Sequence, residues 1–394
     1  MNYKELLVNY PLVRKLSILQ VIAYFGAWFS NVAIYTMLVN FGSSAFAISL
    51  VTAMHFIPAI VIAPLSGTII DRFKIKPLML TLLSTELCMT LLLLTINDKE
   101  DIWLLMILIF IRMSSASMFF SAEMTLLPKI VSGDVLKKTN EIHSIIWSFT
   151  YAFGMAMSGL VVNYFGVKIA IILDALFFIV AILVFFNIEF KVEIVHTKEK
   201  VLSMIKGGFL YIKSNKYVLH LLLLHASVGL TSFDTLVTLL AKNEYKYVIA
   251  VPLSIGITNA IRAIALMVGP FIITNWVNKD RLTLLFIFQG LGIILWGIFQ
   301  FNFYLALIMV FLTGFTTTTI WSMTYAFIQE RVEHKYLGRV ISYNDMIFML
   351  SNVLTTFFIG ILADIIPLSF ITIILGFAFI LVAFYYKKVV KVLL

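Results

Sequence analysis

Twelve long apolar segments follow one another along this chain of 394 residues. Each is about 18 to 25 residues long, the length that a helix needs to cross a hydrocarbon core of about 30 Å. In lipid the backbone amides must be satisfied within the segment itself, which a helix achieves. The sequence therefore predicts an all-α polytopic membrane protein. We place the spans near residues 16–39, 46–70, 78–96, 102–127, 141–164, 169–190, 217–240, 250–276, 282–300, 304–327, 341–363 and 369–386.

The cationic residues are distributed unevenly over the links between these spans. With the N-terminus placed in the cytoplasm, 23 of the 29 Lys and Arg residues fall in inner links, and two, Arg112 and Arg262, fall within spans. The outer links hold only Lys99, Lys168, Lys242 and Lys246. Short loops rich in Lys and Arg are retained in the cytoplasm, so both termini are predicted to be cytoplasmic. A missed or split span would disturb this alternation, so it also supports the count of twelve.

Composition excludes several other classes of protein. Charged residues make up 12% of the chain, against about 25% in a soluble domain, and hydrophobic residues make up 61%. The net charge of +9 is dispersed over the cytoplasmic links, so we expect no nucleic-acid partner. The single cysteine, Cys88, lies in the third predicted span and offers neither a disulfide framework nor a metal site. Neither a GxxxxGK[ST] loop nor a Ser-His-Asp pattern is present, so we expect no cofactor, no metal and no enzymatic activity.

The longest cytoplasmic link divides the chain into six spans and six spans. This link, residues 191–216, has mixed charge and periodic Val, Leu, Met and Ile, which predicts a short amphipathic helix on the membrane surface. We expect an N-terminal bundle over 1–190 and a C-terminal bundle over 217–394. Two six-helix halves joined in this way are typical of carriers in which one half rocks against the other around a midplane site.

One motif after the second span points to a family. The stretch PLSGTIIDRFKIK resembles the loop signature of the major facilitator superfamily through Gly67, Asp71, Arg72 and Lys76, although Lys74 replaces a Gly or Asp of that signature. The stretches GSSAFAISL, LLPKIV, LKKTNEI, ILDALFF and LGRV resemble its drug-exporter branch, which includes macrolide and enterobactin exporters. The resemblance covers the whole chain. It implies two pseudo-symmetric six-helix bundles, a monomer, and spans 1, 4, 7 and 10 lining a central cavity.

The loop signature has a physical interpretation of its own. Asp71, at a helix end, can accept hydrogen bonds from amides at a neighbouring helix N-terminus, while Arg72 and Lys76 can bind carbonyls or carboxylates. Such a clasp would hold the two halves together on the cytoplasmic side. The alternative is that the basic residues only set topology. The spacing of Gly67 favours the clasp, since a topology signal needs no glycine.

Charged side chains within spans indicate function, because each costs at least about 2.5 to 3.5 kcal/mol near the bilayer centre. The resemblance associates Arg112 with proton coupling, and a carboxylate in a dry cavity can be loaded with a proton on one side and released on the other. Glu123 and Asp234 are the candidates for that carboxylate. An interfacial position is the alternative for Glu123. By the resemblance, Glu86 and Asp174 lie on outer spans and have lower priority.

Polar and aromatic side chains form stripes along three of the four spans expected to line the cavity. In span 1 the stripe, at helical spacing, is Gln20, Tyr24, Trp28, Asn31 and Tyr35. Span 7 carries Ser227, Thr231, Asp234 and Thr238, and span 10 carries Thr313, Thr317, Trp321 and Tyr325. Large aromatic faces with few charges suit an amphiphilic organic molecule. The alternative is that the small hydroxyl residues only join helix to helix.

Together these features predict a secondary active exporter of a small amphiphilic organic compound, driven by proton antiport, in the cytoplasmic membrane of a bacterium. Its partners would be the substrate, protons and membrane lipid. Several alternatives stay open. The substrate could be a dedicated metabolite such as a siderophore, or a lipid-like molecule, and the direction could be uptake. Two alternatives belong to other classes of protein: a non-transporting membrane sensor and a membrane-embedded enzyme.

Overall fold

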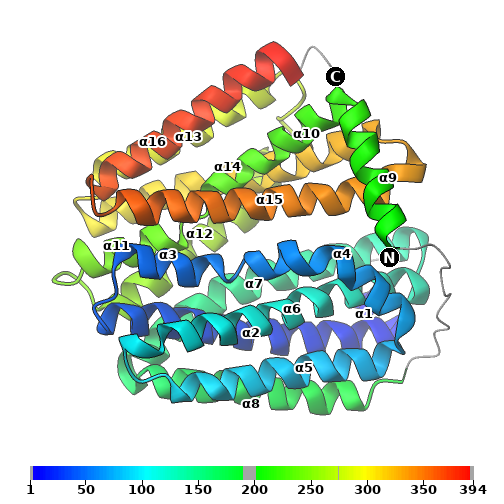
Figure 1. Cartoon of the computed structure of the whole chain (residues 1–394), viewed down its shortest axis with the longest axis horizontal. Coiled ribbons are helices and arrows are strands. Elements are labelled where there is room, and N and C mark those ends of the chain that lie inside the picture. Colours follow the sequence, from blue (N-terminus) through cyan, green and yellow to red (C-terminus); the bar gives the residue numbers. More distant parts are fainter. Residues whose placement is uncertain (1–2, 190–200, 274, 391–394) are drawn as a thin grey trace. The chain divides into compact units, whose positions relative to one another are not determined.

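The computed structural model describes residues 3–189, 201–273 and 275–390, without the side chains of residues 63–65, 67, 68, 71, 134, 137, 201–205, 334, 335, 389 and 390. The described backbone is almost entirely helical (Figure 1). Within it, twelve helical segments are long and apolar enough to cross a membrane. The all-α fold and the number of spans predicted from the sequence are therefore confirmed.

The helices are α1 (Tyr3–Asn9), α2 (Pro11–Asn40), α3 (Ala45–Ala53), α4 (Ile57–Arg72), α5 (Ile75–Leu92), α6 (Ile102–Ile130), α7 (Gly133–Phe165), α8 (Val167–Phe186), α9 (Val201–Ser214), α10 (Lys216–Ala226), α11 (Asp234–Asn243), α12 (Val251–Ile273), α13 (Leu282–Phe299), α14 (Phe303–Arg331), α15 (His334–Leu362) and α16 (Leu368–Tyr385). Local sequence sets several of their ends. The Ser44 hydroxyl accepts from the Ala47 amide at the start of α3. Asn302 caps α14 in the same way. Gly166, at φ 85°, makes the turn between α7 and α8.

Two of the predicted spans are interrupted helices. Span 2 consists of α3 and α4, separated by a turn at residues 54–56, because Pro58 has no amide hydrogen to donate to the Met54 carbonyl. Span 7 consists of α10, the 3₁₀ turn Ser227–Thr231 and α11. In this second break the Thr231 carbonyl accepts from Arg262 Nη2 at 2.5 Å. Irregular backbone at membrane depth needs such a partner.

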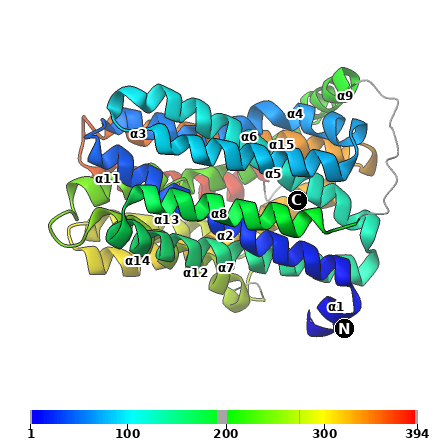
Figure 2. The ribbon, with the colours of Figure 1, turned by 90° about the horizontal axis from the view of Figure 1, so that it is seen from below.

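The chain forms two compact units. Unit 1 comprises Met1–Gly42, Val61–Lys198 and Pro252–Ala260, and unit 2 comprises Ser43–Ile60, Glu199–Val251 and Ile261–Leu394. In unit 1, α2 lies beside α7 and α8, and α5 lies beside α6 and α8 (Figures 1 and 2). In unit 2, α13 packs along α16 and lies beside α14. The division of the chain at 190 and 217 stays a prediction.

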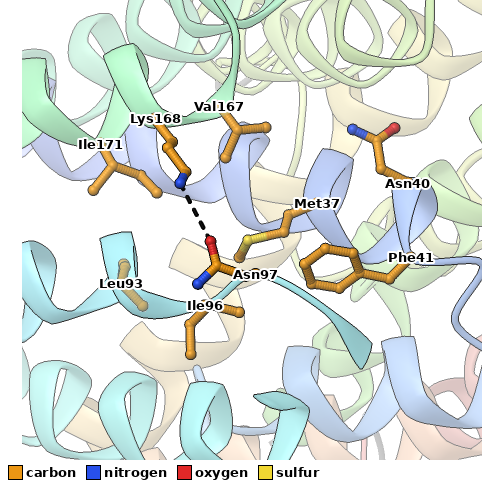
Figure 3. Close-up of a pocket in the computed structure, with 9 residues that line it drawn as sticks. All are labelled: Met37, Asn40, Phe41, Leu93, Ile96, Asn97, Val167, Lys168 and Ile171. Carbon is orange, nitrogen blue, oxygen red and sulfur yellow. Dashed lines mark hydrogen bonds between the residues drawn. The ribbon is translucent and has the colours of Figure 1, made fainter. Parts of the chain in front are cut away.

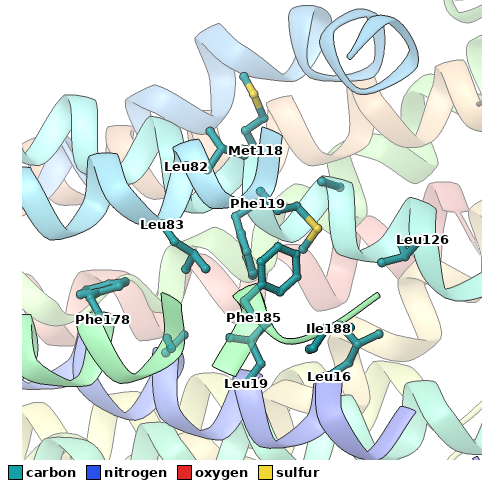
Figure 4. Close-up of a cluster of buried hydrophobic side chains, with 14 of the residues drawn as sticks. Leu16, Leu19, Leu82, Leu83, Met118, Phe119, Leu126, Phe178, Phe185 and Ile188 are labelled. Atoms are coloured by element: carbon teal, nitrogen blue, oxygen red, sulfur yellow. The ribbon is translucent and has the colours of Figure 1, made fainter. Parts of the chain in front are cut away.

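The core of unit 1 is a cluster of large apolar side chains from α2, α5, α6 and α8 (Figure 4). Leu16 and Leu19 of α2 lie at its base, and the rings of Phe119 and Phe185 meet at 6.4 Å between α6 and α8. Each of these side chains is almost fully buried. Because lipid supplies no hydrophobic driving force between helices, this contact stabilises the unit through close packing.

The first helix is packed against the body of unit 1. Leu6 of α1 is fully buried against Ile142 and Ile146 of α7. At the surface, the Tyr3 hydroxyl donates to Glu141 Oε2 at 3.1 Å, and this hydrogen bond to a carboxylate raises the pKa of Tyr3. The helix predicted within the link 191–216 is present as α9. It packs on α15 of its own unit, where the rings of Tyr211 and Tyr336 stack at 4.3 Å.

Candidate functional site

A buried hydrogen-bonded cluster joins three helices of unit 1. Glu123 of α6 is fully buried, and its two oxygens accept from Gln20 Nε2 at 2.6 Å and from the Tyr24 hydroxyl at 3.2 Å. Gln20 Nε2 also lies against His143 Nδ1 of α7, so the two amide hydrogens of one side chain serve two acceptors. We name Gln20, Tyr24, Glu123 and His143 the Glu123 cluster.

The Glu123 cluster combines residues that the sequence placed in different roles. Gln20 and Tyr24 are predicted wall residues of a cavity, and Glu123 is a predicted coupling carboxylate. The structure brings all three together. It also adds His143, which sequence reasoning missed because neither its spacing nor its surroundings in the chain distinguish it from an ordinary buried histidine. Glu123 is fully buried within unit 1.

Further along α2 the predicted stripe becomes aromatic. The Trp28 ring lies 4.5 Å from Tyr151 and 6.1 Å from Trp147, both on α7. The next two stripe residues follow one turn at a time, Asn31 half-buried and Tyr35 almost fully buried. The first half of the stripe is thus a polar cluster and the middle is an aromatic one.

Arg112 forms a buried ion pair that the sequence analysis did not identify. Its Nη2 lies 2.8 Å from Asp174 Oδ2 of α8, and the guanidinium lies over the Phe178 ring at 5.6 Å. Both charged side chains are at most 6% exposed. Arg112 and Glu123, both on α6, thus have separate sets of partners.

In unit 2, Asp234 lies beside the break in span 7. It is the first residue of α11 and is half-buried. Arg262 of α12 binds the Thr231 carbonyl and lies over the Phe233 ring at 5.2 Å. The Thr231 hydroxyl itself donates to the Val228 carbonyl. The predicted stripe on span 7 assumed one continuous helix, and the 3₁₀ turn breaks that register.

The residues of the predicted stripe on α14 lie in two different environments. Thr317 donates to the Thr313 carbonyl at 2.8 Å and lies 3.3 Å from Gln289 Oε1 of α13. One turn on, the rings of Trp321 and Tyr325 stack at 4.9 Å.

Both rings contact His225 of α10, each at 5.4 Å. Phe348 of α15 lies 5.5 Å from the same imidazole, which bonds Thr324 Oγ1 through Nδ1. We name His225, Trp321, Tyr325 and Phe348 the His225 cluster. The sequence identified two of its four rings.

The loop signature is described only in part. The structure does not describe the surroundings of Gly67 or the side chain of Asp71. Arg72 ends α4 and is exposed. Lys76 donates to the Phe186 carbonyl at 2.8 Å and lies over the ring of the same residue. A cation at the last carbonyl of α8 complements the helix dipole, and this contact lies within unit 1. The clasp between halves stays a prediction.

A hollow of about 150 Å³ lies at the ends of α2, α5 and α8 (Figure 3). Lys168 donates to Asn97 Oδ1 at 3.2 Å across it, and Met37 and Phe41 form its apolar side. None of the predicted cavity residues lines it. It is also smaller than the roughly 300 to 1,000 Å³ usual for sites that bind organic ligands. Among the described residues, no group of three or more His, Cys, Asp or Glu is placed to hold a metal ion.

Removing the amide of Gln20 is expected to destabilise the protein. In Gln20→Leu, Glu123 and His143 would each lose a buried partner, at a cost of about 1 to 3 kcal/mol for a lost donor. Thermal unfolding of the purified protein in detergent measures the effect. Asn187→Leu, which removes an exposed amide bonded to the Leu183 carbonyl, is the control and is expected to change stability by less than about 0.5 kcal/mol. Equal stability of the two variants would contradict the prediction.

Comparison with known proteins identifies the class. The family model of the Major Facilitator Superfamily matches residues 16–351. The chain belongs to this superfamily, and it is therefore a multi-pass membrane transporter of the kind that carries small-molecule substrates.

The individual relatives are distant. Macrolide efflux protein A of Streptococcus pyogenes is 22% identical over 348 residues, which cover 85% of each chain. The protein of the same name from Enterococcus faecalis is 22% identical over 322 residues, 78% of this chain and 98% of that one. The crystal structure of nucleoside transporter NupG superposes with a TM-score of 0.72 at 13% identity, covering 95% of this chain and 98% of that chain. At this identity the superposition indicates the fold alone.

Proposed function

We propose that this protein exports a small amphiphilic organic compound in exchange for protons, by alternating access. The observation that carries the proposal is Glu123, a fully buried carboxylate in a membrane span that is held by neutral donors. Two relatives named as macrolide efflux proteins support export of a drug-like molecule.

The Glu123 cluster has the chemistry of a reversible proton site. Burial of a carboxylate away from water disfavours its ionised form, so Glu123 can readily take up a proton. Gln20 and the Tyr24 hydroxyl stabilise the ionised form, and they can stay in place when a proton binds. His143 accepts from Gln20 at Nδ1, so its ring hydrogen is on Nε2, where the side chain can donate it. The proton would then bind and leave within hydrogen-bond reach of the Gln20 side chain.

Aromatic rings support an amphiphilic substrate. Unit 1 presents Trp28, Trp147 and Tyr151, and unit 2 presents Trp321 and Tyr325 of the His225 cluster. Flat apolar faces with a polar edge bind organic molecules that carry few charges, and they discriminate little between related shapes. Neither group includes a fixed cation or anion, so sugar phosphates and inorganic ions fit less well. We place the protein in the cytoplasmic membrane as a single chain with both termini in the cytoplasm.

Transport in inverted vesicles tests the proposal. A pH gradient is expected to drive accumulation of a cationic dye by the native chain, and an uncoupler is expected to abolish it. Glu123→Gln is expected to lose gradient-driven accumulation, because the amide cannot bind the proton. Asp234→Asn tests the second candidate carboxylate. Glu100→Gln, an exposed position at the end of a span, is the matched control and is expected to accumulate dye normally.

Two outcomes would contradict the proposal in different ways. Full accumulation by Glu123→Gln and Asp234→Asn together would exclude both carboxylates from coupling. No accumulation of any dye by the folded native protein would instead favour a dedicated metabolite exporter or an uptake carrier.

A further inference from the structure

Helix α9 lies at the level where a membrane span begins. It ends at Ser214, and the single residue Asn215 separates it from α10, which starts at Lys216. Figures 1 and 2 show α9 running crosswise to α10 and α15 of the same unit, and it packs against both. Because α10 and α15 belong to membrane-spanning segments, a helix that crosses their ends runs along the membrane surface.

One face of α9 packs against α15. Gly207 and Gly208 let the two helices approach closely. A Cβ atom on Gly207 would lie 2.8 Å from Arg339 Nη1, and one on Gly208 would lie 3.0 Å from Arg339 Cβ. On the next turn of α9, the Tyr211 ring stacks on the Tyr336 ring. These contacts fix which side of α9 faces the rest of unit 2.

Four exposed side chains lie together on the other side of α9. They are Lys206, Phe209, Leu210 and Lys213. Their spacings of three and four residues make them neighbours on a helix surface. At 3.6 residues per turn, their mean direction is roughly opposite that of the face that packs on α15. The Phe209 side chain is 54% exposed and the Leu210 side chain 51%. We name these four residues the α9 outer face.

The α9 outer face is basic as well as apolar. Residues 201–216 include no Asp or Glu, and within the described ranges neither Lys206 nor Lys213 forms an ion pair. Water disfavours the two large apolar side chains, and the hydrocarbon core disfavours the two ammonium groups. The boundary between lipid headgroups and acyl chains suits both, because a lysine stem can lie along apolar surface with its ammonium group among the headgroups.

We propose that the α9 outer face binds anionic phospholipids of the adjacent membrane leaflet. Lys206 and Lys213 donate hydrogen bonds to the lipid phosphate groups, while Phe209 and Leu210 lie between the headgroups. Each lysine near an anionic surface strengthens such binding about fivefold. The partner is the lipid surface and not the transported substrate, so the inference goes beyond the proposed export function.

A spin label at residue 210 tests this contact in the full-length protein. The exposed Cys88, the single cysteine of the chain, is first replaced by serine, and Leu210→Cys then carries a nitroxide label. Vesicles of phosphatidylcholine alone are compared with vesicles that also contain phosphatidylglycerol, which is anionic. Electron paramagnetic resonance measures collisions of the label with oxygen, which concentrates in lipid, and with a water-soluble nickel chelate. Labels at Leu381, exposed on a membrane span, and at Glu100, exposed at the end of a span, calibrate lipid and water.

In vesicles with phosphatidylglycerol, the label at residue 210 is expected to lie at a depth between the two calibration sites. In phosphatidylcholine alone it is expected to shift toward the water value. Lys206→Gln with Lys213→Gln is expected to abolish the difference between the two vesicles, and so is high salt, which screens surface charges. Lys387→Gln with Lys388→Gln is the matched control. It removes two exposed positive charges after α16 and is expected to keep the difference.

Three outcomes would overturn the proposal. A label at residue 210 that matches Glu100 in both vesicles would place the α9 outer face in water. Equal depth in the two vesicles would show lipid contact without selection for anionic headgroups. A label reached by neither oxygen nor nickel, with dipolar broadening of its spectrum, would mean that a second copy of the chain covers the face. The substitutions are all at exposed positions, and monodisperse elution before reconstitution verifies folding. No transport is measured, so failure of the dye assay leaves this result intact.

Discussion

Replacing Arg112 by Leu is expected to destabilise the protein by about 3 to 5 kcal/mol, the usual cost of removing one partner from a buried ion pair. The change leaves Asp174 fully buried without its 2.8 Å contact. Thermal unfolding in detergent measures the loss. Lys99→Leu, at an exposed cation, is the control and is expected to stay within about 0.5 kcal/mol of the native protein.

The double variant Arg112→Met with Asp174→Leu sharpens this prediction. Removing both charges leaves apolar side chains in an apolar site, and such replacements of a buried pair are often neutral or stabilising. The double variant is therefore expected to recover most of the stability lost in Arg112→Leu. If it is as unstable as the single variant, the loss came from packing and not from an unpaired charge.

The positions of the spans could be predicted because they depend on length and apolar content alone. The pairing of Arg112 with Asp174 could not be predicted in this way. By the resemblance, α8 was treated as an outer helix and Asp174 received low priority. A helix has two faces, however, and on α8 the exposed side chains include Leu176, Ile179 and Leu183, while Asp174 is fully buried. Knowing which span is peripheral does not tell which of its faces is buried.

The predicted stripes illustrate a second limit of prediction from the sequence. Residues four apart on an α-helix differ by about 40° in direction, so three successive steps rotate a stripe by about 120°. Thr313 and Tyr325 on α14 are three such steps apart, and they have different neighbours. On α2 one step of three residues corrects the drift, which keeps Gln20 to Tyr35 closer to one face. The break in span 7 could not be predicted from the sequence, for another reason. It is stabilised by Arg262, and no local pattern shows which distant side chain will bind a free carbonyl.

Substituting Gly269 is expected to have the largest effect of any single methyl group added to unit 2. A Cβ atom on this residue of α12 would collide with the Phe315 carbonyl oxygen of α14. No side chain can turn aside, because the obstacle is backbone. Overpacking usually costs about 1 to 3 kcal/mol, and a backbone clash of this size is expected to exceed that range. Gly269→Ala should therefore yield little folded protein, measured as the monodisperse fraction after detergent extraction.

The same crossing shows why the two helices cannot simply move apart. Pro270 has no amide hydrogen for the Leu266 carbonyl, and the Thr318 hydroxyl of α14 donates to that oxygen at 2.8 Å instead. Separating α12 from α14 to admit a methyl group would break this bond and leave a carbonyl unsatisfied. Gly292→Ala is the matched control, because its Cβ would meet nothing nearer than 3.6 Å. That variant is expected to fold with unchanged or slightly higher stability, since Ala favours a helix over Gly. Normal folding of Gly269→Ala would mean that the helices cross with more freedom than this contact allows.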